Sequence, residues 1–134
     1  SPAVAGELEL KMGSKALRLF RVRAVDGVAI CEVETFLPLP RFDRLVETDL
    51  GSRSLYSVLA KEFGVVPTVG RRRIQSAAAA EDTALNLGIE PGDPLLEVTA
   101  VNVDQNGTPF EFFRALYRGD STRFELSVGP RSKK

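Results

Sequence analysis

Apolar and polar residues alternate along residues 16–37 in the way that two neighbouring β-strands require. The pair Asp26-Gly27 interrupts this alternation, and such a pair is a strong signal for a tight hairpin turn. A second stretch of the same kind covers residues 95–117, where Asn106-Gly107 separates an aliphatic run from one rich in phenylalanine. Since residues 17–26 resemble residues 95–104, the pattern indicates a degenerate internal repeat of a β-hairpin.

Helical spacing is found between the two predicted hairpins. One apolar stripe recurs every three or four residues and predicts a helix over residues 54–63, formed by Leu55, Val58, Leu59 and Phe63. A serine at position 52 or 54 can cap its start, and Gly64 can end it. Residues 67–77 predict another strand and the alanine-rich residues 78–87 a short helix. Residues 124–128 predict a last strand.

Together these elements predict a single α+β domain with a central antiparallel β-sheet flanked by helices. We expect a loosely ordered lead-in over residues 1–15, the domain itself over residues 16–128 and a flexible tail over residues 129–134. The phenylalanines at 110, 112 and 113 point to both faces of their strand by alternation. That surface exceeds what one small core covers easily, so we expect a homodimer.

The composition disfavours several classes of function. Eighteen basic residues balance eighteen acidic ones, whereas a free-standing nucleic-acid binder usually has a basic excess. Histidine is absent, which removes the common nucleophile pairs and the commonest metal ligand, and no glycine-rich phosphate loop occurs. We therefore expect no enzyme, no catalytic residues, no metal and no cofactor. The single cysteine, Cys31, and the lack of a long apolar run or signal-peptide pattern predict a cytoplasmic protein without membrane contact.

Two arginines are candidates for binding an anion. Alternation places Arg21 and Arg23 on one strand face, roughly 6–7 Å apart, and guanidinium groups bind phosphates and carboxylates in a bidentate manner. An ordinary solvent-facing strand is the alternative. Because Leu17 and Leu19 share that face, the arginines can also border an apolar lining.

Further candidates come from the predicted helix and the last hairpin. Ser54 and Tyr56 open the helix, whose N-terminus offers free N–H groups to an anion, although Ser54 can equally be a plain cap. Glu111 and Tyr117 share a strand face and can bind hydroxyl or amine groups. Alternatively, Tyr117 lies in the core and Glu111 pairs with an arginine. The run at residues 71–73 and the acids at 32 and 34 are interpreted as surface charge.

Several motifs, taken in order, resemble the UTRA domain of the HutC branch of GntR-type transcription regulators, from about residue 17 to residue 124. The matching stretches are Arg21-Val-Arg23-Ala-Val-Asp26-Gly27, Phe36-Leu-Pro38, Ser54-Leu-Tyr56 with the following helix and Gly64, Leu95-Leu-Glu-Val, Gly107-Thr-Pro109-Phe-Glu111, and Tyr117-Arg-Gly-Asp120.

The resemblance implies a chorismate-lyase-like fold, a homodimer, and a ligand-sensing role in a regulator, for example a repressor. Its effector would be a small anionic metabolite such as a sugar phosphate or an organic acid. Four residues would hold the phosphate: Arg21, Arg23, Ser54 and Tyr56. Glu111 and Tyr117 would contact the rest of the ligand. DNA would be bound only through a separate winged helix-turn-helix domain, which this sequence does not show.

Two departures from the family pattern bear on the ligand. Val33 stands where some relatives have a glutamate, which disfavours an amino sugar, and the family's first strand region is not recognisable in residues 1–15. Two alternatives remain open. One is a small lyase-like enzyme that holds an anionic substrate with arginines and uses Glu111 as an acid. The other is a module that only dimerises.

Overall fold

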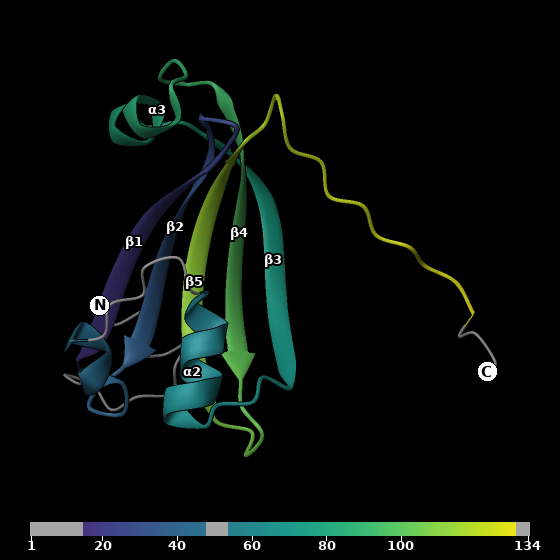
Figure 1. The fold of residues 1–134 in the computed structure, drawn as a ribbon. Helices are drawn as coiled ribbons and strands as arrows, with labels where there is room; N and C mark the ends of the chain where they lie inside the picture. Colours follow the sequence, from purple (N-terminus) through teal and green to yellow (C-terminus); the bar gives the residue numbers. More distant parts are fainter. Residues whose placement is uncertain (1–14, 48–53, 131–134) are drawn as a thin grey trace.

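The computed structural model describes residues 15–47 and 54–130, which form one antiparallel sheet with helices near its two ends (Figure 1). The sheet has the strand order β1-β2-β5-β4-β3. Its strands are β1 (Ala16–Val25), β2 (Val28–Pro38), β3 (Val69–Ala78), β4 (Pro94–Val103) and β5 (Pro109–Arg118). The helical elements are the 3-10 helix η1 (Asp43–Glu47), α2 (Leu55–Phe63) and α3 (Glu81–Leu87). The α+β fold class predicted from the sequence is thus confirmed.

Both predicted hairpins form, and their turns explain why. Asp26 and Gly27 have φ angles of 51° and 78°, the left-handed pair that a two-residue hairpin turn needs. In the second turn the Asp104 carboxylate accepts hydrogen bonds from the N–H groups of Asn106 and Thr108, at 2.9 and 3.0 Å. The β1–β2 and β4–β5 hairpins then join through β2 and β5 at the centre of the sheet.

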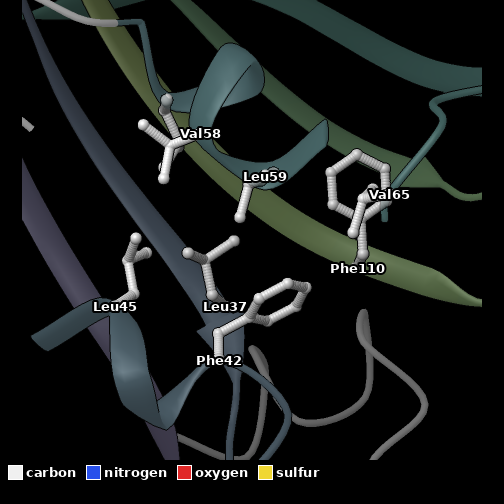
Figure 2. Close-up of a cluster of buried hydrophobic side chains, with 8 residues drawn as sticks. Leu37, Phe42, Leu45, Val58, Leu59, Val65 and Phe110 are labelled. Carbon is white, nitrogen blue, oxygen red and sulfur yellow. The ribbon is translucent and has the colours of Figure 1, made fainter. Parts of the chain in front are cut away.

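Helix α2 covers one end of one sheet face, which we call the α2 face. Its predicted boundaries are confirmed, because the Ser54 hydroxyl oxygen accepts a hydrogen bond from Ser57 N–H at 3.1 Å, and Gly64 ends the helix with φ 64°. The apolar stripe of α2 packs onto β1, β2 and the start of β5 (Figure 2). This cluster contains Leu37, Phe42, Leu45, Leu55, Val58, Leu59, Val65 and Phe110.

Helix α3 packs on the opposite face, the α3 face, against Leu95 and Leu116. It is shorter than predicted because residue 78 still belongs to β3, and the residue at its N-cap, Ala80, has no side-chain cap. The predicted strand over residues 124–128 is wrong for this chain's own sheet, because that segment is extended without strand pairing. Most of the predicted lead-in, residues 1–14, lies outside the described residues.

The phenylalanines that suggested a homodimer are largely covered within the chain. Phe110 is fully buried in the α2 cluster, and Phe112 is half-buried with its ring centroid 6.1 Å from that of Phe36. Phe113 is half-buried beneath an arginine. The homodimer therefore stays a prediction, and these side chains alone do not require it.

Candidate functional site

The α2 face brings together residues from all five strands and from the first turn of α2. Residues directly opposite one another in a sheet share a face, and Arg21 lies opposite Val33, which lies opposite Ala115. Arg23 is aligned in the same way with Cys31 and Tyr117. The predicted strand face of Arg21 and Arg23 is therefore the α2 face, and Leu17 and Leu19 border it as expected.

A network of four hydrogen-bonded side chains lies beside α2. The Tyr56 hydroxyl donates to Glu111 Oε1 at 2.6 Å, and Asn102 Nδ2 donates to the same oxygen at 2.7 Å. Arg72 Nη1 donates to Asn102 Oδ1 at 2.9 Å, and its guanidinium carbon lies 5.3 Å from the centroid of the Phe113 ring. Glu111 is 2% exposed and Asn102 6% exposed. The network therefore fixes the Glu111 carboxylate as a hydrogen-bond acceptor.

A glycine in β3 leaves room for this network. A Cβ atom on Gly70 would lie 2.4 Å from Asn102 Oδ1 and 2.5 Å from Arg72 Nη1, closer than non-bonded atoms approach. The backbone of Gly70 is not in the left-handed region, so conformational freedom is not its role. Its lack of a side chain instead allows Arg72 to reach Asn102.

Two polar atoms on the α2 face are buried without a hydrogen-bond partner, Arg21 Nε and Thr35 Oγ1. Burial lowers the pKa of the Arg21 guanidinium, the nearby charge of Arg23 lowers it further, and Glu111 acts in the opposite direction. Buried polar groups are normally hydrogen-bonded, so unpaired ones mark places that a ligand or water completes. An anion between the two arginines would satisfy Arg21 and relieve their repulsion.

The six residues predicted from the sequence do not all meet at one point. The Tyr56 hydroxyl donates to Glu111, and the Arg21 charge lies near enough to lower the pKa of Tyr56, so these three residues belong to one part of the face. Arg23 and Tyr117 lie farther along the same face, and six residues of strand separate Tyr117 from Glu111 by roughly 20 Å. The Ser54 hydroxyl oxygen accepts the hydrogen bond that caps α2, as the alternative interpretation of this serine expected, and its contact with an anion stays a prediction.

Sequence reasoning missed three polar residues of the α2 face: Thr35, Arg72 and Asn102. Arg72 is exposed, as its interpretation as surface charge expected, but it also donates a hydrogen bond to Asn102 and lies over the Phe113 ring. Alternation places Arg72 on the opposite strand face from its two arginine neighbours, and this is the sequence signal that could have distinguished it from them. Thr35 and Asn102 gave no signal, because their position depends on which strands become neighbours.

A cavity of about 460 Å³ lies on the other face, between α3 and the sheet. None of the six predicted residues lines it. Its charged lining consists of Arg18, Glu32, Glu34, Asp82 and Arg114. Arg18 pairs with Glu34 and Arg114 with Glu97, whereas Glu32 Oε1 is buried without a partner. An acidic lining of this kind is unsuited to an anion, so the α2 face is the better candidate.

The described residues offer little for metal binding or membrane insertion. Within residues 15–47 and 54–130, no group of histidine, cysteine, aspartate and glutamate side chains is arranged to hold a metal ion. None of the helices in those ranges has the length and apolarity needed to cross a bilayer. Burial raises the pKa of the Cys31 thiol, as expected for a buried, apolar cysteine.

Known proteins that are similar to this chain are transcription regulators. The model of the UTRA domain matches residues 1–123. The HTH-type transcriptional repressor PhnF of Mycolicibacterium smegmatis is 33% identical over 121 residues, which cover 90% of this chain and 49% of the repressor. The HTH-type transcriptional repressor NagR of Bacillus subtilis is 27% identical over 107 residues, 80% of this chain and 44% of that protein. The chain thus spans about half the length of these curated relatives.

Solved structures show the same fold. The effector domain of PhnF from Mycobacterium smegmatis superposes with a TM-score of 0.90 and 31% sequence identity, covering 97% of this chain and 80% of that one. A GntR-family transcriptional regulator from Enterococcus faecalis gives a TM-score of 0.84 and 28% identity, with 96% of this chain and 91% of that chain covered. The chorismate-lyase-like sheet expected from the resemblance is confirmed by these likenesses.

Proposed function

Because the chain belongs to the UTRA domain family and matches effector domains of GntR-family transcriptional regulators, we propose that its α2 face binds a small anionic metabolite. Binding there would change the DNA affinity of a regulator, and DNA itself would be contacted by a separate winged helix-turn-helix domain. The observation that carries the proposal is the Arg21 guanidinium, which is partly buried, repelled by Arg23 and unpaired at Nε.

The anion is expected between Arg21, Arg23 and the start of α2. Tyr56 lies in the first turn of α2 and is electrostatically coupled to Arg21, which supports a position for the helix start near the guanidinium. The free N–H groups of that turn and the positive end of the helix dipole would add to the attraction. Thr35 Oγ1, buried and unpaired on the same face, is available as one more donor.

A sugar phosphate or an organic acid with further polar groups fits this arrangement. The acceptor carboxylate of Glu111 and the phenol of Tyr117 would contact the part of the ligand that extends away from the anion. Val33 is 8% exposed and lies between Arg21 and Ala115, so the floor of the site is apolar there. An amino sugar would find no carboxylate at this position, and we expect it to bind more weakly than the corresponding hydroxyl sugar.

A thermal-shift panel of sugar phosphates, phosphonates and organic acids tests the proposal, because a bound ligand raises the unfolding temperature by mass action. The best ligand is then titrated by calorimetry into Arg21→Ala and Arg23→Ala. Each loss of a charge-assisted hydrogen bond should weaken binding about ten- to a hundredfold.

Arg73→Ala is the matched control, since it removes the same charge from the α3 face of β3. It should leave the affinity within about twofold, because a distant exposed charge is largely screened. Unchanged affinity in both site variants, or a best ligand that is neutral and apolar, would contradict the proposal.

We further propose that the chain acts as a homodimer in the cytoplasm and belongs to the HutC branch, as the family resemblance implies. The likeness to transcriptional regulators favours regulation over catalysis. The lyase-like alternative needs Glu111 as an acid, yet its Oε1 atom already accepts two hydrogen bonds from neutral donors. Incubation with chorismate should therefore give no product above the uncatalysed rate.

A further inference from the structure

Arg72 of β3 leans inward over the α2 face and reaches the middle of the sheet. β4 lies between β3 and β5, yet the Arg72 guanidinium lies over the ring of Phe113 in β5, 5.3 Å from its centroid. Its Nη1 atom also donates to Asn102 Oδ1 in β4 at 2.9 Å. These two contacts hold a cation above the same face on which Arg21 and Arg23 lie.

Gly70 makes this position of Arg72 possible. A glycine in the interior of a strand weakens the strand, and the backbone of Gly70 is not in the left-handed region that would require one. A Cβ atom at this position would lie 2.5 Å from Arg72 Nη1, so any larger residue would push the guanidinium away. The local sequence therefore favours the placement of Arg72 over the regularity of β3.

Most of the hydrogen-bonding capacity of Arg72 is not used by the protein. A guanidinium has five N–H groups. Within residues 15–47 and 54–130, the Arg72 side chain donates one hydrogen bond, to a neutral amide, and forms no ion pair. On the α3 face, by contrast, Arg18 is paired with Glu34 and Arg114 with Glu97. The charge of Arg72 is thus available to an anion from solution.

The α2 face carries an excess of positive charge. Among its described strand residues are three arginines, Arg21, Arg23 and Arg72, and one carboxylate, Glu111, which give a net charge of +2. The Glu111 side chain is 2% exposed, and its Oε1 atom already accepts two hydrogen bonds. A ligand with more than one negative charge therefore matches this face better than a monoanion does.

The arginines lie on the two edge strands of the sheet, so one anionic group cannot contact all three. Arg21 and Arg23 are in β1 and Arg72 is in β3, with three strands between them (Figure 1). At about 4.8 Å between neighbouring strands, the two backbones are roughly 19 Å apart. The charges of Arg21 and Arg72 nevertheless both act on Tyr56, because both side chains extend toward the middle of the sheet. The space between them suits one small ligand.

We propose that the effector carries two separate anionic groups, one held by Arg21 and Arg23 and the other by Arg72. The middle of the ligand would lie over the apolar side chains of Val33 and Ala115 in the central strands. This inference rests on the proposed function and narrows it. It favours acids with a phosphate or phosphonate at one end and a carboxylate at the other, or dicarboxylic acids, over sugars with a single phosphate.

Two pairs of probes test the contact with Arg72. 3-Phosphoglycerate and glycerol 3-phosphate differ only in a carboxylate that replaces a hydroxymethyl group, and 6-phosphogluconate and sorbitol 6-phosphate repeat this difference on a longer chain. In at least one pair, calorimetry should show the carboxylate binding about tenfold tighter or more, as one charge-assisted contact predicts. In Arg72→Gln this preference should fall below about threefold, while the affinity for the probe without the carboxylate should change less than about twofold.

Matched variants separate the charge of Arg72 from its position. Arg73→Gln removes the same charge from the α3 face of β3 and should leave the preference unchanged. Gly70→Ala keeps every charge but displaces Arg72 or Asn102, and it should lower the preference as well. Gly129→Ala is its control, because a Cβ atom there would meet nothing within 4 Å. Unfolding temperatures confirm that each variant is folded.

Three outcomes would be decisive against the second contact or against the site as a whole. Equal binding within both probe pairs, or a preference for the carboxylate that survives Arg72→Gln, would overturn the inference. Weaker binding of the monophosphate probes to Arg21→Ala in those cases would leave the proposed function standing. If none of the four probes and no other anion binds, the proposed function fails and the inference fails with it.

Discussion

The Tyr56 hydroxyl donates to Glu111, and the charges of Arg21 and Arg72 act on it from the two edge strands, β1 and β3, of the same sheet face. Burial, the Glu111 charge and the hydrogen bond to Glu111 together raise the pKa of this phenol. It therefore stays protonated and keeps donating to the carboxylate at any physiological pH.

Replacing Tyr56 with phenylalanine tests this role. Tyr56→Phe should lower the free energy of unfolding by about 1–3 kcal/mol near neutral pH, because a buried carboxylate loses a donor. Because the pKa of Tyr56 is raised in the folded state, its contribution to the free energy of unfolding is fully present below the unfolded-state pKa of about 10. That contribution declines as the pH rises above this value. Urea unfolding at pH 8 and pH 10.5 should show the difference between parent and variant shrinking.

Tyr117 provides the control for that experiment. Burial also raises its pKa, so Tyr117→Phe should alter the alkaline dependence without the loss at neutral pH, since its hydroxyl donates to no carboxylate within residues 15–47 and 54–130. A Tyr56→Phe difference that stays constant across this pH range would contradict the coupling to Glu111.

Arg21 and Arg72 show how far single residues could be predicted. Arg21 was identified from alternation and from its arginine neighbour, both local properties of one strand. Arg72 obeys the same alternation, but its role depends on Asn102 and on the missing side chain of Gly70. A local pattern predicts which face of the strand a side chain lies on, whereas the strand order determines which residues it contacts on that face.

At the scale of elements, caps and turns made the prediction accurate. Ser54 and Gly64 determine where α2 begins and ends, and Asp26 and Gly27 determine the first turn. Where such a signal is lacking, the observed boundary of the element differs from the predicted one. Helix α3 begins after Ala80, which offers no side-chain cap, and the alanines before it extend β3 instead. The helix η1 was not predicted, because a single turn has no periodicity to detect.

Ser54 separates capping from ligand binding. Ser54→Ala should cost about 1 kcal/mol of stability, since the N–H of Ser57 loses its acceptor. Ser54→Asp keeps the cap and places a negative charge where the anion is expected. Its unfolding temperature should match the parent, while calorimetry should show anion affinity at least tenfold lower. Equal affinity in the aspartate variant would place the anion away from the helix start.

The sheet of the whole molecule depends on pairing between strands that are distant in the sequence, and no local sequence pattern predicts this pairing. Each hairpin is local, but the strand order places β2 against β5 and leaves β3 at an edge. The predicted final strand shows the same limit. Its alternation was detected correctly, yet the segment finds no partner strand within its own sheet, because strand formation needs an edge as well as a pattern.

Charge distribution predicts how this chain behaves toward DNA. Its acidic and basic residues balance, and the described helices carry only Arg44 in η1 and Lys61 in α2 as basic residues, with none in α3. Sequence-specific binding needs a basic, base-contacting element. A gel-shift experiment with the isolated chain should show no sequence-dependent complex that survives competitor DNA. Such a complex would mean that the sheet contacts DNA directly.

The central seam of the sheet also determines the order in which the protein can fold. Thr35 of β2 pairs with Phe113 of β5, so the first hairpin leaves the ribosome long before its partner strand exists. Non-local pairings of this kind form late and leave intermediates with open strand edges. β2 is such an edge, and it carries Glu32 and Glu34 among its apolar residues. Charges on an exposed edge discourage pairing with other chains, so we expect these two acids to reduce aggregation of the nascent hairpin until β5 is made.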